Sequence, residues 1–193
     1  MISKILHSAI ENNNGKIVVL SIQKKWLDKI KSGKKTLEIR KSSPWDLQYP
    51  FAVMCYETKK EGGCGKIAAA FVCNEIETLH CFEDLAYTAT GDEIPAVTKR
   101  FCEQGCMSQK ELYDYGRTAG RLYGWHVSNI ELFDAELREM GVRRAPQSWQ
   151  YGKLRYNREY IIICGDNNIG FSRRHYRFRG NIGFVLYPIL PVL

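Results

Sequence analysis

The sequence lacks the patterns that would place the chain in a membrane or outside the cell. No apolar run reaches the length of about 20 residues that a helix needs to cross a bilayer. Residues 1–16 contain no apolar signal-peptide core, so we expect no secretory signal. The seven cysteines are odd in number and scattered, which argues against a disulfide framework. We therefore expect a reduced, cytoplasmic protein.

Common catalytic and cofactor motifs are also missing from the sequence. It contains no P-loop, no dinucleotide-binding glycine pattern and no Gly-x-Ser-x-Gly turn. The candidate zinc ligands are His80, Cys81, Cys102 and Cys106. The Cys-x3-Cys spacing of Cys102 and Cys106 suits zinc. Strong zinc sites, however, have two closely spaced pairs of ligands, and buried free cysteines are common. We expect no metal and no cofactor.

Positive charge is what the sequence has in excess, with a net charge of +7 and a pI near 9.0. One basic cluster consists of Lys24, Lys25, Lys29, Lys31, Lys34 and Lys35. A second cluster consists of Arg173, Arg174, Arg177 and Arg179. Such clusters favour a polyanionic partner, nucleic acid first. The alternative is a solvated surface that keeps a small protein soluble.

The segment 17–41 has the clearest local pattern. Residues 17–22 are β-branched and apolar, which predicts a buried strand, and apolar residues at helical spacing predict a short helix before Ser32 and Gly33. Residues 36–40 alternate as a strand does, so Leu37 and Ile39 are expected in the core. Thr36, Glu38 and Arg40 then share the opposite face, beside Lys35.

The rest of the chain predicts a mixed architecture. Strands are expected at 51–56, 123–133 and 160–164, one long strand or a bent pair of strands at 66–79, and short helices at 83–86, 94–103 and 108–115. Ser108 and Glu111 form a capping-box pattern. We predict an α+β fold built on a small mixed β-barrel with flanking helices. Its parts are an N-terminal arm at 1–16, a domain at 17–165 with a helical insertion at 82–122, and a basic and apolar tail at 166–193.

Three segments resemble the ASCH domains of the PUA-like superfamily, of bacterial or phage type. SGKKTLEIRK (32–41) is similar to their G-x-K-T-x-E-x-R signature, and residues 65–79 look like the glycine-led strand that follows. Residues 124–154, which include the Pro-Gln-Ser-aromatic turn, look like their C-terminal part. The resemblance implies a PUA-like barrel and covers residues 17–165 in order, but fold does not dictate function.

Lys35, Glu38 and Arg40 are the candidate catalytic residues. Glu38 could transfer a proton, and Lys35 could stabilise an oxyanion or a phosphate. The alternative is a structural Glu38–Arg40 ion pair at the barrel rim. Some small ASCH proteins are amidohydrolases acting on acetylated cytidine, with a catalytic lysine and a threonine three residues later. Lys35 matches that lysine, but Glu38 stands where the threonine would be, so that activity is not carried over.

The turn at 146–151 supplies the second group of candidates. Gln147 and Ser148 are placed to enter a cleft, and Trp149 either stacks on a base or plugs the barrel end. The predicted nucleic-acid-binding residues are Lys24, Lys25, Lys31, Lys34, Gln147, Ser148, Trp149, Arg173 and Arg174. We expect Gln147 and Ser148 to line one solvent-accessible pocket with Thr36, Glu38 and Arg40.

Three function classes follow from these observations. The first is a nucleic-acid-binding protein that holds RNA or a single strand in a basic cleft. The second is an enzyme acting on RNA or a modified nucleoside, as a ribonuclease or an amidohydrolase. The third is an accessory domain that contacts a protein through the insertion at 82–122. The sequence leaves the choice among them open.

Overall fold

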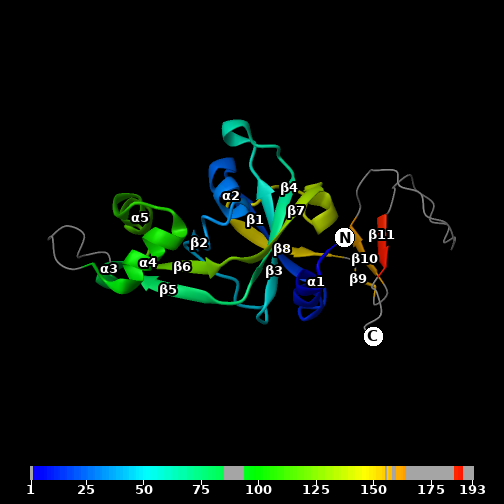
Figure 1. Cartoon of the computed structure of the whole chain (residues 1–193), viewed down its shortest axis with the longest axis horizontal. Helices are drawn as coiled ribbons and strands as arrows, with labels where there is room; N and C mark the ends of the chain where they lie inside the picture. The colour runs from blue at the N-terminus through cyan, green and yellow to red at the C-terminus, as the bar shows by residue number, and fades with distance from the viewer. Residues whose placement is uncertain (1, 85–93, 155, 158–159, 164–184, 189–193) are drawn as a thin grey trace.

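The computed structural model describes residues 2–84, 94–154, 156–157, 160–163 and 185–188. Their strands form one five-stranded sheet and two three-stranded sheets, accompanied by helices, so the fold is mixed α+β (Figure 1). Arg173, Arg174 and most of the predicted tail lie outside the described residues. No helix in the described ranges has the length and apolar character to cross a membrane.

The five-stranded sheet is the centre of the molecule. Its order is β7 (Ser128–Ala135), β4 (Ile67–Cys73), β3 (Phe51–Glu57), β1 (Lys16–Ile22) and β8 (Trp149–Lys153). β1 runs parallel to β3, and the other neighbours are antiparallel. Every residue of β3 is buried, as are residues 17–22 of β1, because both faces of the sheet are covered.

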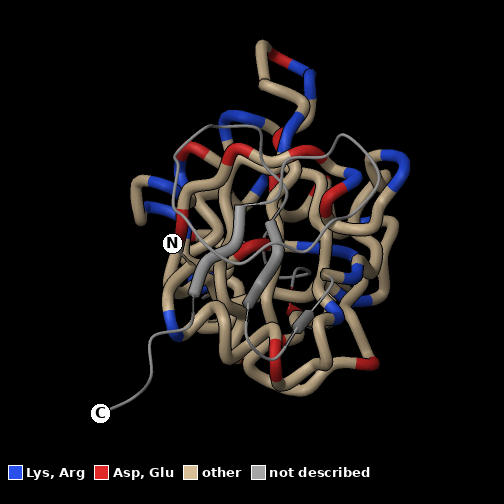
Figure 2. Tube along the Cα trace, turned by 90° about the vertical axis from the view of Figure 1, so that its right-hand side faces the viewer, with Lys and Arg blue, Asp and Glu red and all other residues tan. Residues whose placement is uncertain are grey.

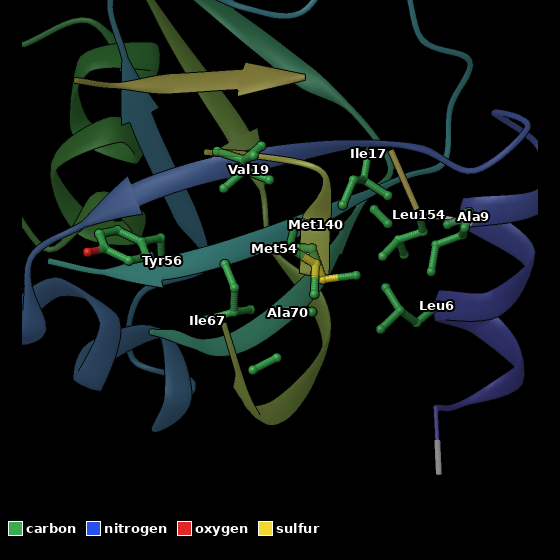
Figure 3. Packing of buried hydrophobic residues seen from close by; sticks show 14 of the residues in the cluster. Leu6, Ala9, Ile17, Val19, Met54, Tyr56, Ile67, Ala70, Met140 and Leu154 are labelled. Carbon is green, nitrogen blue, oxygen red and sulfur yellow. The ribbon is translucent and has the colours of Figure 1, made fainter. Parts of the chain in front are cut away.

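One face of this sheet packs against helix α1 (Lys4–Glu11), which begins after the N-cap Ser3. Leu6, Ala9 and Ile10 of the helix are fully buried against the sheet, where they meet residues such as Met54 (Figure 3). The sequence predicts a helix or arm here. In the structure this segment is part of the core, because its apolar stripe packs on a sheet face that would otherwise be exposed.

The opposite face packs against helix α2 (Lys24–Lys31) through Leu27 and Ile30. The helix ends at Ser32, and Gly33 then adopts a φ of +72°, which glycine tolerates without strain. These features were predicted from the sequence and are confirmed. The turn leads directly into β2 (Leu37–Arg40).

β2 belongs to a second sheet with the order β2, β6 (Arg121–His126) and β5 (Ile76–His80). Of the two alternatives expected for 66–79, the structure shows the pair of strands, β4 and β5. Helices α3 (Cys81–Asp84), α4 (Ala96–Gly105) and α5 (Gln109–Gly116) lie at this end of the molecule (Figure 1). They fall within the predicted insertion, and the capping box at Ser108 is confirmed. Leu37 and Ile39 pack against Phe101 of α4.

The strand pairing found in the described residues does not close into the predicted barrel. β7 and β8 are the edges of the five-stranded sheet. The segment predicted as a closing strand is β10 (Tyr160–Ile163), which pairs instead with β9 (Tyr156–Asn157) and β11 (Val185–Pro188). The remaining elements are two short 3-10 helices at Lys60–Gly62 and Leu137–Met140.

Candidate functional site

Lys35, Glu38 and Arg40 form one ion-pair network, as the sequence predicts for neighbours on a strand. Lys35 Nζ lies 3.4 Å from Glu38 Oε2. Arg40 Nε donates to Glu38 Oε1 at 2.8 Å, and its Nη2 lies 2.7 Å from the same oxygen. Glu38 thus pairs with one cation on each side of it, and two guanidinium nitrogens of Arg40 contact the same carboxylate oxygen.

This network is buried, which corrects the expectation of an open pocket. Leu37 and Ile39 are buried as predicted and Thr36 is exposed, but Lys35 is only 3% exposed and Glu38 only 4%. The alternation along β2 directs Glu38 away from Leu37, but it does not determine what covers that second face. We therefore describe the network as an internal charge cluster.

The C-terminal end of α4 covers the network. Lys35 Nζ donates to the carbonyl oxygen of Gly105 at 2.7 Å, and Lys29 Nζ donates to that of Cys106 at 3.3 Å. The N–H of Thr36 donates to Gln104 O at 3.0 Å. Carbonyls at a helix C-terminus carry partial negative charge and favour nearby cations. The helical insertion is thereby fixed to β2 by charge and by main-chain hydrogen bonds.

Trp26 of α2 lies beside the same lysines and was not singled out from the sequence. The ammonium nitrogens of Lys29, Lys35 and Lys25 lie 4.6, 5.3 and 5.6 Å from the centre of its ring. Such cation–π contacts favour positive charge at the ring face. The signal in the sequence is the Trp-x-x-Lys spacing, which places Lys29 on the same helical face as Trp26.

Burial changes the acid–base properties of groups around the network. Loss of hydration lowers the pKa of Lys35 below its ordinary value, although the charge of Glu38 acts in the opposite direction. Burial likewise raises the pKa of Tyr115, a residue of α5. A lysine with a lowered pKa gains the ability to act as a base or a nucleophile.

Ser21 on β1 connects the network to the second predicted motif. Arg40 Nη2 donates to Ser21 O at 2.8 Å, and Ser21 N donates to Ser148 O at 2.9 Å. Ser21 Oγ also donates to Pro146 O at 2.7 Å. Glu38 and Ser148 therefore lie on the same side of the molecule, joined through Arg40 and Ser21. Because Glu38 is buried, this connection does not amount to the open shared pocket that the sequence predicts.

The turn before β8 carries charge that the sequence reasoning missed. Arg143, Arg144 and Gln147 are exposed. Within the described residues, neither arginine makes an ion pair or a side-chain hydrogen bond. The signal was the Arg-Arg pair just before the Pro-Gln-Ser turn. We call residues 143–148 the arginine turn; it continues into Trp149, which is half-buried and packs on Trp125 with 5.8 Å between ring centres.

The predicted basic helix is less cationic than its sequence suggests. Lys24 pairs with Asp28 at 2.8 Å, Lys31 with Glu57 at 3.4 Å, and Lys25 approaches Glu61 at 3.9 Å. Lys34 is exposed and makes no ion pair in the described ranges. Figure 2 shows positive positions interspersed with negative ones around the molecule. The charge of α2 is therefore largely compensated.

The loop at 41–50 contacts β8, one of the two edge strands of the five-stranded sheet, and we call the two together the β8 edge (residues 41–50 and 149–153). Trp149 Nε1 donates to Ser42 Oγ at 2.9 Å. The backbone N–H groups of Trp45 and Asp46 both donate to the hydroxyl of Tyr151 at 3.3 Å. The loop is thereby held to β8 through the side chains of Trp149 and Tyr151.

The cysteines in the described part of the chain are all free, and they are Cys55, Cys64, Cys73, Cys81, Cys102 and Cys106. Within the same residues, no group of three or more His, Cys, Asp or Glu side chains is arranged to hold a metal ion. The candidate zinc ligands considered from the sequence thus do not come together there.

The chain is similar to known proteins in its structure. No family model matches the chain, and no curated protein matches it. The crystal structure of an ASCH protein from Zymomonas mobilis is similar with a TM-score of 0.54 and 16% identity, covering 69% of this chain and 85% of that one. The crystal structure of its serine-to-alanine variant is similar with a TM-score of 0.55 and 15% identity. That match covers 71% of this chain and 88% of the other. A likeness at this level of identity establishes a shared fold.

Proposed function

We propose that this chain, which has the fold of the ASCH domain proteins, binds nucleic acid, with single-stranded RNA as the favoured ligand. The observation that carries the proposal is the arginine turn, where Arg143 and Arg144 are exposed and, among the described residues, unpaired. Arginine suits phosphate because its planar donors match the phosphate oxygens. Counterions released from the phosphates add to the affinity.

The surroundings of the turn support the same ligand. Gln147 is exposed and offers both a donor and an acceptor for the edge of an unpaired base. Trp149 and Tyr151 follow on β8 with 5.4 Å between ring centres, and aromatic rings are the usual partners of unstacked bases. In this proposal the ligand runs from the arginine turn along the β8 edge, rather than over α2, whose lysines are largely paired.

The proposal also covers the type of fold and the cellular environment of the protein. The five-stranded sheet, the sheet of β2, β6 and β5, and their helices act as a PUA-like unit that carries the ligand face. The chain works in a reducing cytoplasm, an environment that the free cysteines of the described residues support.

A titration at two salt concentrations tests the proposal. Purified protein is mixed with labelled single-stranded and duplex RNA and DNA, and binding is followed by fluorescence polarisation. We expect binding at low salt that weakens as salt rises, because each neutralised phosphate releases counterions. Absence of binding to all four ligands at low salt would contradict the proposal.

A second candidate function is an enzyme acting on RNA or a modified nucleoside. It is favoured by Lys35, whose lowered pKa and contact with Glu38 are features of reactive lysines. The test is turnover of labelled RNA and of acylated nucleosides by the wild type and by Lys35→Arg, with the exposed Lys34→Arg as control. If the wild type leaves every substrate intact, this candidate fails and nucleic-acid binding stands alone.

A further inference from the structure

Trp45 is an unusually exposed tryptophan in the loop that covers the β8 edge. It is 86% exposed, the largest value among the exposed large hydrophobic residues of the described chain. Its ring makes no aromatic or cation contact with any other described residue. Burying such a side chain typically stabilises a fold by several kcal/mol, roughly 25 cal/mol per Å² of apolar surface. A single exposed apolar residue is common on protein surfaces, so a binding role for Trp45 depends on how its backbone is held and on what lies beside it.

The loop holds the backbone of Trp45 in place while its ring stays exposed. Tyr151 accepts hydrogen bonds from the N–H groups of both Trp45 and Asp46. Asp46 pairs with Lys16, whose ammonium group lies 4.0 Å from the centre of the Tyr151 ring. Ser42, three residues before Trp45, accepts a hydrogen bond from the indole N–H of Trp149. Anchors on both sides of Trp45 reduce the entropy that is lost when the ring binds a partner.

The position of Trp45 decides which partner fits. Trp149 and Tyr151 are two residues apart on the same face of β8, and their ring centres lie 5.4 Å apart. The loop runs beside them and places Trp45 at Tyr151. The arginine turn directly precedes Trp149. Phosphate-binding groups and an aromatic face thus follow each other along one edge.

We infer that Trp45 is a stacking platform for an unpaired base and that it makes the site selective for single strands over duplexes. A duplex keeps its bases stacked on each other, so their faces are not available to an indole ring. The inference rests on the proposed function, because a base reaches Trp45 only if the strand binds at the β8 edge. It adds the ligand class and the residue that selects it.

The test separates stacking from phosphate binding. Affinities are measured for a short single-stranded oligoadenylate, for an abasic chain with the same number of phosphates, and for a duplex. Wild-type protein should prefer the oligoadenylate. Trp45→Ala should bind oligoadenylate about 5- to 150-fold more weakly, the range of one base–aromatic stack, and the abasic chain with unchanged affinity. Trp45→Phe should keep most of the preference.

The control is Leu132→Ala, because Leu132 is also exposed, at 74%, but lies on β7 at the other edge of the sheet. It should leave all affinities unchanged. Equal effects of Trp45→Ala on the oligoadenylate and the abasic chain, or no effect on either, would overturn the inference while the proposed function stands. A dimer that Trp45→Ala converts to a monomer would also overturn it. Failure of the wild type to bind any probe would instead refute the proposed function.

Discussion

Replacing Glu38 by glutamine should destabilise the protein strongly. Glu38 pairs with Lys35 at 3.4 Å and with Arg40 at 2.7 Å, and its side chain is 5% exposed. At 3.4 Å and an effective dielectric constant near 20, the lysine pair alone has a gross attraction of about 5 kcal/mol, which desolvation offsets in part. Glutamine keeps the size of Glu38 but leaves two cations without a counter-charge. We expect the free energy of unfolding to fall by about 3–5 kcal/mol.

Urea denaturation followed by circular dichroism measures this loss as a shift of the midpoint at constant slope. Asp28→Asn is the control: it removes an acid that pairs with Lys24 at the surface, and it should change the midpoint much less. Adding Lys35→Met to Glu38→Gln should recover part of the stability, because the buried ammonium group is then gone. A loss below about 1 kcal/mol for Glu38→Gln would refute the reasoning that this network is desolvated.

Two further predictions concern packing and pH. Gly152→Ala should lower the free energy of unfolding by about 1–3 kcal/mol in the same assay, because the added Cβ would lie 2.6 Å from Met140 O. Gly120→Ala is the control and should be neutral, because a Cβ there would have no atom within 4 Å. Burial raises the pKa of Cys73 from 9.0 to about 12, so the unfolded thiol ionises first and the free energy of unfolding should fall as pH rises between these values. Cys73→Ala should reduce that slope, and an unchanged slope would contradict the assignment.

Local patterns account for the parts of the fold that were predicted correctly. The apolar spacing of α2, the glycine after it and the alternation of β2 are properties of neighbouring residues. The pairing of β1 with β3 is parallel and joins segments far apart in the chain, so no local pattern reveals it. The same holds for α1, whose apolar stripe indicates a buried face but not the sheet that buries it. For the same reason, local patterns do not determine how the strands of the predicted barrel pair.

The candidate site divides in the same way. The proximity of Glu38 to Arg40 follows from strand geometry, and the link to Ser148 was expected from the order of the motifs. The burial of Lys35 depends on Gly105, which the helical insertion supplies from a distant part of the chain. Trp45 follows Pro44, and this pattern indicates only where the preceding strand ends. Its exposure depends on how the loop folds over β8, which sequence alone does not specify.

The salt dependence of RNA binding by Arg143→Ala/Arg144→Ala tests the central claim most directly. Its control is Arg117→Ala/Arg121→Ala, which removes the same charge from two exposed arginines at the end of the molecule that carries the helical insertion. If the arginine turn holds phosphates, its double variant should bind single-stranded RNA more weakly, and the slope of log affinity against log salt should fall by about 1 per lost contact. The control should keep the wild-type slope. Equal slopes and affinities for the two double variants would contradict the claim.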